Sequence, residues 1–243
     1  MDIFSSFNDH NTSITKADIN KITNFNPINV MLYQKAFIHK SVLRFLVDSD
    51  IKEYNTSYER FEFLGDSVLN IIIAEYIFNK YPDKEEGYLT RIRTKLVNGK
   101  TLAYLAKKLE LNKFLIISKN VETIGGRNND RILEDVFEAF LCSIYKDLGF
   151  KYTKEFVLSS IEKFIDINMV EEDTNYKDIL LRKCQQMYQE SPEYELKSTT
   201  GPAHKKMFTS VVIIKGQYYS SGTGKTKKES EQMASKLTLD SFN

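Results

Sequence analysis

A chain of 243 residues is long enough for one large domain or two ordinary ones. An apolar share of 42% with 28% charged residues is typical of a soluble, folded, helix-rich protein. No apolar run reaches the length of a membrane span, and the polar first residues lack the pattern of a signal peptide, so we expect neither a membrane protein nor a secreted one. The formal net charge of +1 hides an asymmetry, because residues 175–243 carry eleven Lys and Arg against seven Asp and Glu. This excess predicts a basic C-terminal module attached to a mildly acidic one.

The two cysteines, Cys142 and Cys184, lie far apart in the chain and show no spacing typical of metal ligands. Unpaired thiols of this kind are typical of proteins that stay in a reducing compartment. We therefore expect two reduced thiols inside the fold and a cytoplasmic location.

The sequence of the N-terminal half of the chain predicts helices. Residues 1–27 are polar and rich in asparagine, and we expect a loosely ordered leader or a short helix there. Apolar residues at helical spacing predict a helix over residues 28–45, which a charged loop follows. The stretch YERFEFLGDSVL, residues 58–69, begins a long helix that ends at Pro82. The next segment, EEGYLTRIRTKLVNGKTLAYLAKKLEL, alternates basic and apolar residues at helical spacing.

The C-terminal half begins with helices and then changes its pattern. ILEDVFEAFLCSIYKDLG predicts an apolar helix with Gly149 as its C-cap, and a further helix runs to about Asn168. Beyond the acidic stretch EEDTN, one helix precedes YELKSTT, KMFTSVVIIKG and YYSSGTG, which have the composition of strands, and another helix follows them. The sequence therefore predicts an α+β protein: an all-α domain over residues 28–168, a linker over 169–174 and a small αβββα domain over 175–243.

Two of the predicted helices carry pairs of acids in strongly apolar surroundings. Glu62 and Asp66 are four residues apart, and Asp135 and Glu138 are three apart, so each pair shares one helix face. Four carboxylates between packed helices repel one another unless a cation lies among them. Mg²⁺ prefers such oxygen ligands and can activate water for attack on a phosphodiester. Each pair alone also fits a solvated helix face, and the case for a metal site depends on both occurring together.

Several segments resemble the ribonuclease III family, in the family's order. ERFEFLGDSVL closely resembles its signature, with Phe61 where Leu is common. LYQKAFIHKS, EEGYLTRIRTKLVNGKTLAYLAKKL and GGRNNDRILEDVFEAFLCSIYKDLG resemble its other segments, so the resemblance covers about residues 28–150. NYKDILLRKCQQ, GPAHKKMF and GTGKTKKESEQMA resemble a double-stranded-RNA-binding domain, which often follows the nuclease domain in this family.

The resemblance assigns roles to acids at matching positions. The residues that match the family's catalytic, metal-binding carboxylates are Glu62, Asp66, Asp135 and Glu138. Glu59 and Glu86 match acids with supporting roles. Glu134 departs from the family, which commonly has a small residue there, and we expect it to face outward, about a quarter turn from Asp135.

The C-terminal module contains residues suited to duplex RNA, which proteins recognise through shape, phosphates and 2′-hydroxyls. Lys225, Lys227 and Lys228 open its last helix, where the helix dipole also favours phosphate. The resemblance further implies RNA contacts for two turn residues, His204 and Lys205, and two residues of the first helix, Gln185 and Gln186. The lysine run alone also fits a solvated helix start.

The resemblance implies an endoribonuclease that hydrolyses double-stranded RNA in RNA processing or degradation. It implies Mg²⁺, with Mn²⁺ as a substitute, products with 5′-phosphate and 3′-hydroxyl ends, and a homodimer. Phe61 and Phe63 are candidate contact residues of that dimer, and Phe63 equally fits an ordinary core position. The alternative from another class is a protein that sequesters duplex RNA without cutting it. Its expected mark is the loss of one or more metal-binding carboxylates, and none of the four is missing. A metal-dependent DNA nuclease fits the acids but not the C-terminal module. The physiological RNA stays open.

Overall fold

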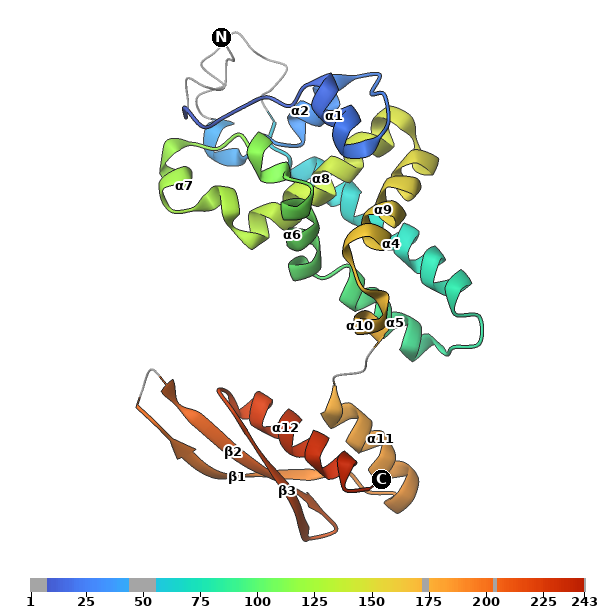
Figure 1. Ribbon diagram of the computed structural model, residues 1–243, viewed down its shortest axis with the longest axis vertical. Coiled ribbons are helices and arrows are strands. Elements are labelled where there is room, and N and C mark those ends of the chain that lie inside the picture. The colour runs from blue at the N-terminus through green and yellow to red at the C-terminus, as the bar shows by residue number, and fades with distance from the viewer. Residues whose placement is uncertain (1–7, 44–55, 172–174, 203–204, 243) are drawn as a thin grey trace. The chain divides into compact units, whose positions relative to one another are not determined.

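The computed structural model describes residues 8–43, 56–171, 175–202 and 205–242. The chain divides into two compact units, Met1–Val170 and Glu171–Asn243, each with its own hydrophobic core (Figure 1). The first unit is helical and the second combines helices with a small sheet, which confirms the predicted α+β class. Among the described segments, none of the helices has the length and apolar character needed to cross a membrane.

The first unit is built from helices joined by short 3₁₀ turns. In chain order the elements are α1 (Lys16–Thr23), α2 (Val30–Lys35), η2 (Lys40–Val42), α4 (Glu59–Lys80), α5 (Glu86–Leu96), α6 (Gly99–Lys108), η4 (Leu111–Phe114), α7 (Lys119–Thr123), η5 (Gly126–Asn128), α8 (Asp130–Leu148), α9 (Phe150–Phe164) and α10 (Ile167–Glu171). The predicted linker, residues 169–174, thus overlaps α10, and residues 172–174 lie outside the described ranges.

Helix α8 forms the centre of the first unit. Asn129 caps its N-terminus by accepting hydrogen bonds from the Arg131 and Ile132 amides, and Gly149 ends it as predicted. From Val136 to Ile144 every residue of this helix is buried. Such a helix needs partners on several sides, and α4, α6 and α9 pack around it.

Helices α4 and α8 approach unusually closely because α4 carries a glycine at the contact. A Cβ atom added to Gly65 would lie 1.9 Å from the backbone oxygen of Glu138. Real Cβ atoms do not come so near to other heavy atoms, so a side chain at this position would force the helices apart. The contact therefore fixes the separation of the two helices that carry the predicted acid pairs.

The helix predicted over residues 28–45 is shorter than expected. It ends at Lys35, after which the Ile116 amide donates to the Phe37 oxygen and the His39 amide donates to the Ile116 oxygen. These long-range bonds replace the bonds that would have continued the helix. His39 then caps η2 through its Nδ1, which accepts from the Ser41 amide.

Part of the predicted polar leader, residues 1–27, is packed into the first unit. Ile14 and Ile19 are buried in its core, and α1 has a capping box between Thr15 and Asp18. The short helix that was one of the two expectations for this segment is therefore present as α1, and the described part of the segment is continuous with the helical unit and is not a loosely ordered leader.

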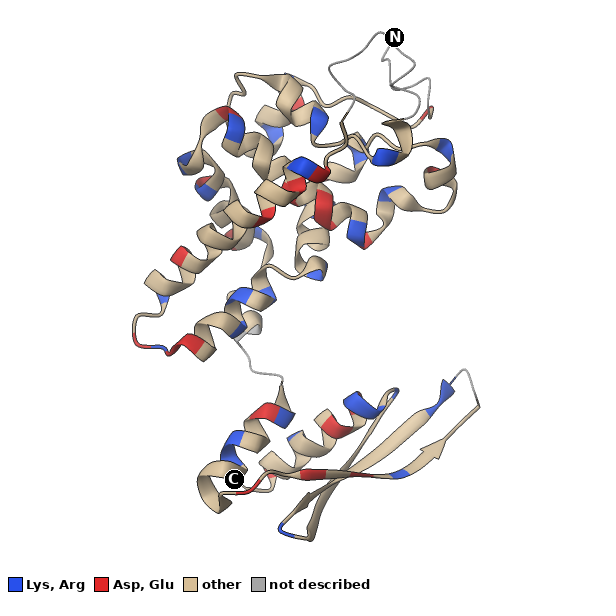
Figure 2. Ribbon diagram, turned by 180° about the vertical axis from the view of Figure 1, so that it is seen from behind, with Lys and Arg blue, Asp and Glu red and all other residues tan. Residues whose placement is uncertain are grey.

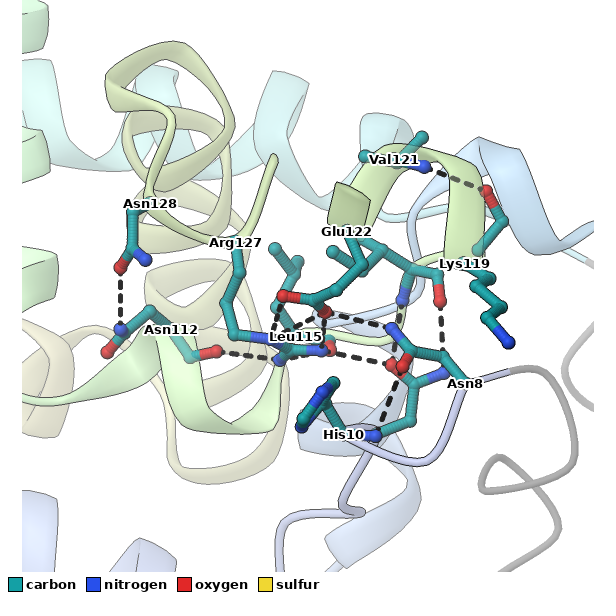
Figure 3. A network of polar contacts seen from close by, with 12 residues as sticks. Asn8, His10, Asn112, Leu115, Lys119, Val121, Glu122, Arg127 and Asn128 are labelled. Carbon is teal, nitrogen blue, oxygen red and sulfur yellow. Dashed lines mark hydrogen bonds and ion pairs between the residues drawn. The ribbon is translucent and has the colours of Figure 1, made fainter. Parts of the chain in front are cut away.

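A polar network centred on Arg127 joins this N-terminal segment to the loop before α8 (Figure 3). The Arg127 guanidinium donates to both carboxylate oxygens of Glu122, and its Nη1 donates to the Asn112 and Leu115 oxygens at 2.9 and 2.7 Å. Asn8 donates to Glu122, and Arg127 Nη2 donates to Asn11 Oδ1. The network thus ties three stretches of chain that are distant in sequence.

Replacing Arg127 by alanine is expected to destabilise the first unit by about 2 kcal/mol, because it removes the ion pair of the half-buried Glu122 and the guanidinium donor to two carbonyls. Urea unfolding measures this change. Lys107→Ala is the control, since the Lys107–Asp130 pair is exposed and should contribute less than about 0.5 kcal/mol. An equal loss in both variants would show that the network adds no stability beyond that of a surface ion pair.

The second unit has the predicted αβββα order. Its elements are α11 (Tyr176–Tyr188), β1 (Glu193–Thr200), β2 (Met207–Ile214), β3 (Gln217–Gly224) and α12 (Lys227–Asp240). The antiparallel sheet has the order β1-β2-β3, with register irregularities in both strand pairs. Leu180, Cys184, Val212, Ile214 and Ala234 form the small core between helices and sheet. Both cysteines of the chain are buried and free, as predicted.

Candidate active site and RNA-binding residues

The two predicted acid pairs lie on neighbouring helices of the first unit. Glu62 and Asp66 belong to the N-terminal half of α4, and Asp135 and Glu138 belong to α8, which packs against it. In Figure 2, acidic segments of the first unit lie close together on adjoining helices. Glu138 is buried, with 8% of its surface exposed, whereas Asp66 is exposed. The predicted carboxylates are thus brought together at one place on the molecule.

The charges of these acids act on one another. Burial, followed by the negative charges of Asp66 and Glu134 and then of the other acids, raises the pKa of Glu138 to about 8. Burial and the charges of Asp135 and Glu59 likewise raise the pKa of Glu62. Without a metal, repulsion between the carboxylates therefore opposes the ionisation of all of them, and a bound cation would offset that repulsion.

Neighbouring side chains hold several of the acids in place. The buried Tyr58 hydroxyl donates to Asp135 Oδ2 at 3.2 Å, and Asn70 Nδ2 donates to Asp66 Oδ1 at 2.7 Å. Burial and the Asp135 charge raise the pKa of the Tyr58 hydroxyl, which keeps it protonated and able to donate. These donors fix the orientation of one carboxylate on each helix.

The two predicted supporting acids differ in position. Glu59 is exposed at the start of α4, where Lys40 donates to it at 2.9 Å and Ser57 at 3.2 Å. The hydrogen bond from Lys40 lowers the pKa of Glu59, and Lys40 also acts electrostatically on Glu62. Glu86 lies at the start of α5, exposed and hydrogen-bonded to Thr90, and does not join the other acids within this chain.

Glu134 does not face outward as expected. It is half-buried, and its carboxylate lies against Gly99 at the start of α6, where a Cβ would be 2.2 Å from Oε2. Burial and the charge of Asp135 raise its pKa, so it belongs to the same acidic cluster. The prediction failed because the helical period places a side chain relative to its own helix and does not reveal a neighbouring glycine.

The acids suit a hard divalent cation in their chemistry, since all of them offer carboxylate oxygens. In the described parts of the chain, however, no three Asp, Glu, His or Cys side chains converge closely enough to hold a metal ion. The acids can raise one another's pKa without lying at metal-binding distances, because charges interact over distances much longer than a metal–ligand bond. The donor set therefore fits Mg²⁺, and its side chains would have to come closer together to bind it.

The predicted RNA-binding residues of the second unit lie at its surface. Lys225, Lys227 and Lys228 are exposed around the start of α12, where Thr226 caps the helix by accepting from the Glu229 amide. Gln185 and Gln186 are exposed on α11, and Lys205 is exposed in the turn before β2. His204 lies outside the described residues.

Tyr58, which orients Asp135, was not predicted from the sequence. Tyr58 carries no charge and lies 77 residues before Asp135, so nothing in its spacing points to that carboxylate. Asn70, in contrast, lies four residues after Asp66 on the same helix face, where such a hydrogen bond is expected. The only available signal was that a polar hydroxyl in a buried position requires a hydrogen-bond partner.

Comparisons with known proteins agree with this arrangement. The Ribonuclease-III-like family model matches residues 29–164, and the double-stranded RNA binding motif matches residues 176–241. Putative protein A464R of Paramecium bursaria Chlorella virus 1 is 39% identical over 225 residues, which cover 93% of this chain and 78% of that protein. Ribonuclease 3 of Listeria innocua is 36% identical over 212 residues, covering 87% of this chain and 91% of that one.

A solved structure of the nuclease domain of ribonuclease III from Campylobacter jejuni has a TM-score of 0.55 and 32% identity, covering 62% of this chain and 99% of that one. A helical unit with facing acid pairs, followed by a double-stranded-RNA-binding unit, defines an endonuclease of double-stranded RNA. The chain belongs to the ribonuclease III family.

Proposed function

We propose that this endoribonuclease uses four carboxylates to hold Mg²⁺, with Mn²⁺ as a substitute: Glu62, Asp66, Asp135 and Glu138. The observation that carries the proposal is the placement of both acid pairs on packed helices, with the pKa of Glu138 raised to about 8 by burial and by its acidic neighbours. When bound, the ion would activate water and offset negative charge on the scissile phosphate. Products would carry 5′-phosphate and 3′-hydroxyl ends.

The remaining residues of the site would act on the carboxylates and the substrate. Tyr58 holds Asp135 and Asn70 holds Asp66, so each helix presents one carboxylate in a fixed orientation. Lys40 neutralises Glu59 at the edge of the cluster, which limits the repulsion that an approaching phosphate meets there. Glu59 and Glu86 are assigned supporting roles.

Cleavage of a uniform long RNA duplex tests the proposal. The wild-type chain should cut the duplex in Mg²⁺ or Mn²⁺ but not in EDTA, and should leave single-stranded RNA and duplex DNA intact. A nuclease that requires a 5′-phosphate should degrade the separated products. Tight duplex binding without cleavage in either metal would instead identify a protein that sequesters RNA.

We also propose that two copies of the chain form a homodimer through α4. Phe63, Ile71 and Phe78 lie within one arc of this helix and are 77%, 58% and 68% exposed. Phe61, the other candidate contact residue, packs against the core instead. The nuclease domain of ribonuclease III from Campylobacter jejuni has a structurally flexible region that is involved in dimer formation of that protein.

Ile71→Glu is expected to weaken self-association at least about tenfold, because it places a charge in the centre of the exposed apolar face. Sedimentation velocity over a concentration series measures the change. Ile124→Glu, at a more exposed position outside α4, is the control and should leave self-association unaltered. A wild-type chain that stays monomeric at all concentrations would contradict the proposed dimer.

The lysines at the start of α12 are proposed to bind phosphates of duplex RNA. Changing Lys227 and Lys228 together to glutamine should weaken duplex binding about tenfold and reduce the slope of log affinity against log salt by about 2. The control changes Lys215 and Lys236 to glutamine, which removes the same charge elsewhere in the unit. Filter binding in EDTA at several salt concentrations measures both quantities, and equal slopes in the two double variants would contradict the assignment.

We place the protein in the cytoplasm, where its two free, buried thiols would stay reduced. RNA processing or degradation is the role that a duplex-specific endoribonuclease would serve there.

A further inference from the structure

A cavity of about 320 Å³ lies in the first unit where α1, α6, η4 and α9 meet. Each of these four elements contributes one lysine to its lining: Lys21, Lys108, Lys113 and Lys163. The apolar part of the lining includes two half-buried rings, Phe114 and Phe164. We call this cavity the lysine cleft, and none of the predicted catalytic or RNA-binding residues lines it.

The lysine cleft has an excess of positive charge. Its two acids are already engaged, since Asp18 accepts hydrogen bonds from Thr15 in the α1 capping box and Glu110 pairs with Lys113 at 2.7 Å. Lys21 acts electrostatically on Glu110 and Lys108 Nζ lies 5.3 Å from the centre of the Tyr104 ring, but among the described residues Lys21, Lys108 and Lys163 form no ion pair. Three ammonium groups therefore remain available to an anion that enters the cleft.

The helix dipole accounts for a lysine at the end of each helix, but it does not account for the convergence of these lysines on one cavity. Lys21, Lys108 and Lys163 lie in the last turns of α1, α6 and α9, where a cation interacts favourably with the helix dipole. That interaction would be satisfied equally well by three helix ends pointing in different directions. Here the three ends and η4 surround a single concave volume.

The aromatic side chains of the lysine cleft give it an apolar part as well as a charged rim. Phe114 packs edge-on against the buried Phe37, with ring centroids 5.8 Å apart, so its position is fixed by the core. Lys163 Nζ lies 5.1 Å from the centre of the Phe164 ring, which brings ammonium and aromatic surface together. A ligand that combines a flat ring with a phosphate matches this pairing, because bases stack on aromatic side chains while lysines bind phosphate.

The lysine cleft is separated from the acids by the length of α6. Gly99 at the first position of α6 touches Glu134, whereas Lys108 lies nine residues later, or about 13.5 Å along the helix axis. The acidic cluster and the lysine cleft are therefore different sites at opposite ends of one helix.

We propose that the lysine cleft binds a nucleoside phosphate, with the base against Phe114 or Phe164 and the phosphate on Lys21, Lys108 and Lys163. Its volume lies at the lower end of the range of small-molecule sites, which suits a single nucleotide. A free nucleotide and one nucleotide of a single RNA strand share this chemistry. The proposal concerns binding alone and does not depend on metal or on cleavage.

Photolabelling of the full chain in EDTA tests the proposal, with 8-azidoadenosine 5′-monophosphate and a single-stranded oligonucleotide containing 4-thiouridine as the probes. Mass spectrometry of the digested protein locates the labels. We expect labelled peptides that contain Phe114 or Phe164. The two probes distinguish the sources. Stronger labelling by the azido nucleotide indicates a free nucleotide, and stronger labelling by the oligonucleotide indicates an RNA strand. Unlabelled AMP should compete with either probe for the site.

A pair of charge-matched variants makes the test specific. Lys108→Gln with Lys163→Gln should reduce labelling of these peptides about tenfold, since two charge-assisted phosphate contacts are lost. Lys119→Gln with Lys151→Gln removes two exposed lysines outside the cleft and should label as the wild type does. The proposal is overturned if neither probe labels the Phe114 and Phe164 peptides, or if the two double variants label them equally.

Discussion

Glu138→Gln is expected to lower the rate of duplex cleavage in Mg²⁺ by at least about a thousandfold, or about 4 kcal/mol of activation free energy. Glutamine nearly preserves the shape of the side chain but removes the charge from the most buried of the four proposed metal ligands. Single-turnover cleavage with saturating enzyme measures the chemical step without a contribution from duplex affinity. Glu155→Gln, at an exposed position of α9, should cut at the wild-type rate.

The same substitution should stabilise the metal-free protein. The pKa of Glu138 is about 8 in the folded chain, against an ordinary value of 4.5, so the folded state binds this proton more tightly than the unfolded state does. The free energy of unfolding of the wild type in EDTA therefore falls as the pH rises from about 4.5 to about 8. The Glu138→Gln variant lacks this titrating group. The difference between its free energy of unfolding and that of the wild type should therefore grow, in favour of the variant, as the pH rises across that interval.

Urea unfolding in EDTA at pH 5 and pH 8 compares the two proteins. A variant that is inactive yet more stable at pH 8 would separate the catalytic role of Glu138 from any role in folding. Cleavage within tenfold of the wild-type rate would remove Glu138 from the proposed metal ligands. An unaltered stability difference between the two pH values would show that Glu138 is not held in a raised-pKa environment.

Gly65→Ala is expected to destabilise the first unit by about 3 kcal/mol or to prevent its folding, because the new methyl group would lie 1.9 Å from the Glu138 backbone oxygen. The clash involves two helix backbones in the core, so rotation of a side chain cannot relieve it. Any folded fraction should also cut poorly, since moving α4 away from α8 separates the two acid pairs.

Gly87→Ala provides a matched control for Gly65→Ala. Gly87 lies in α5, and a Cβ there would meet nothing within 4 Å. Alanine should therefore stabilise this helix by up to about 1 kcal/mol through its better helix propensity. Thermal unfolding measures both variants, and a Gly65→Ala protein as stable as Gly87→Ala would contradict the close helix contact.

The elements predicted well from sequence are those with a strong local pattern. The period of the apolar residues located α4 and α8, and the alternation of short β-branched runs with turn residues located the three strands of the second unit. Because spacing also fixes the face on which a side chain lies, the acid pairs could be assigned to facing helices before their contact was known.

The features that sequence analysis missed all depend on long-range contacts. The helix predicted over 28–45 stops early because its backbone bonds to Ile116, and the polar N-terminal segment is ordered because Asn8 and Asn11 reach Glu122 and Arg127. Glu134 turns inward because a glycine on another helix leaves space for it. A local pattern contains no information about partners a hundred residues away.

The contact at Gly65 also has a kinetic consequence for the acids. It holds the α4 and α8 backbones against each other at Glu138 itself, so the helices have little freedom to close further around an ion. The carboxylates can then converge only by changing side-chain rotamers, without a movement of either helix. Ion uptake by the folded chain should accordingly follow a single fast phase in stopped-flow experiments, without the slow phase that a movement of helices or domains would add.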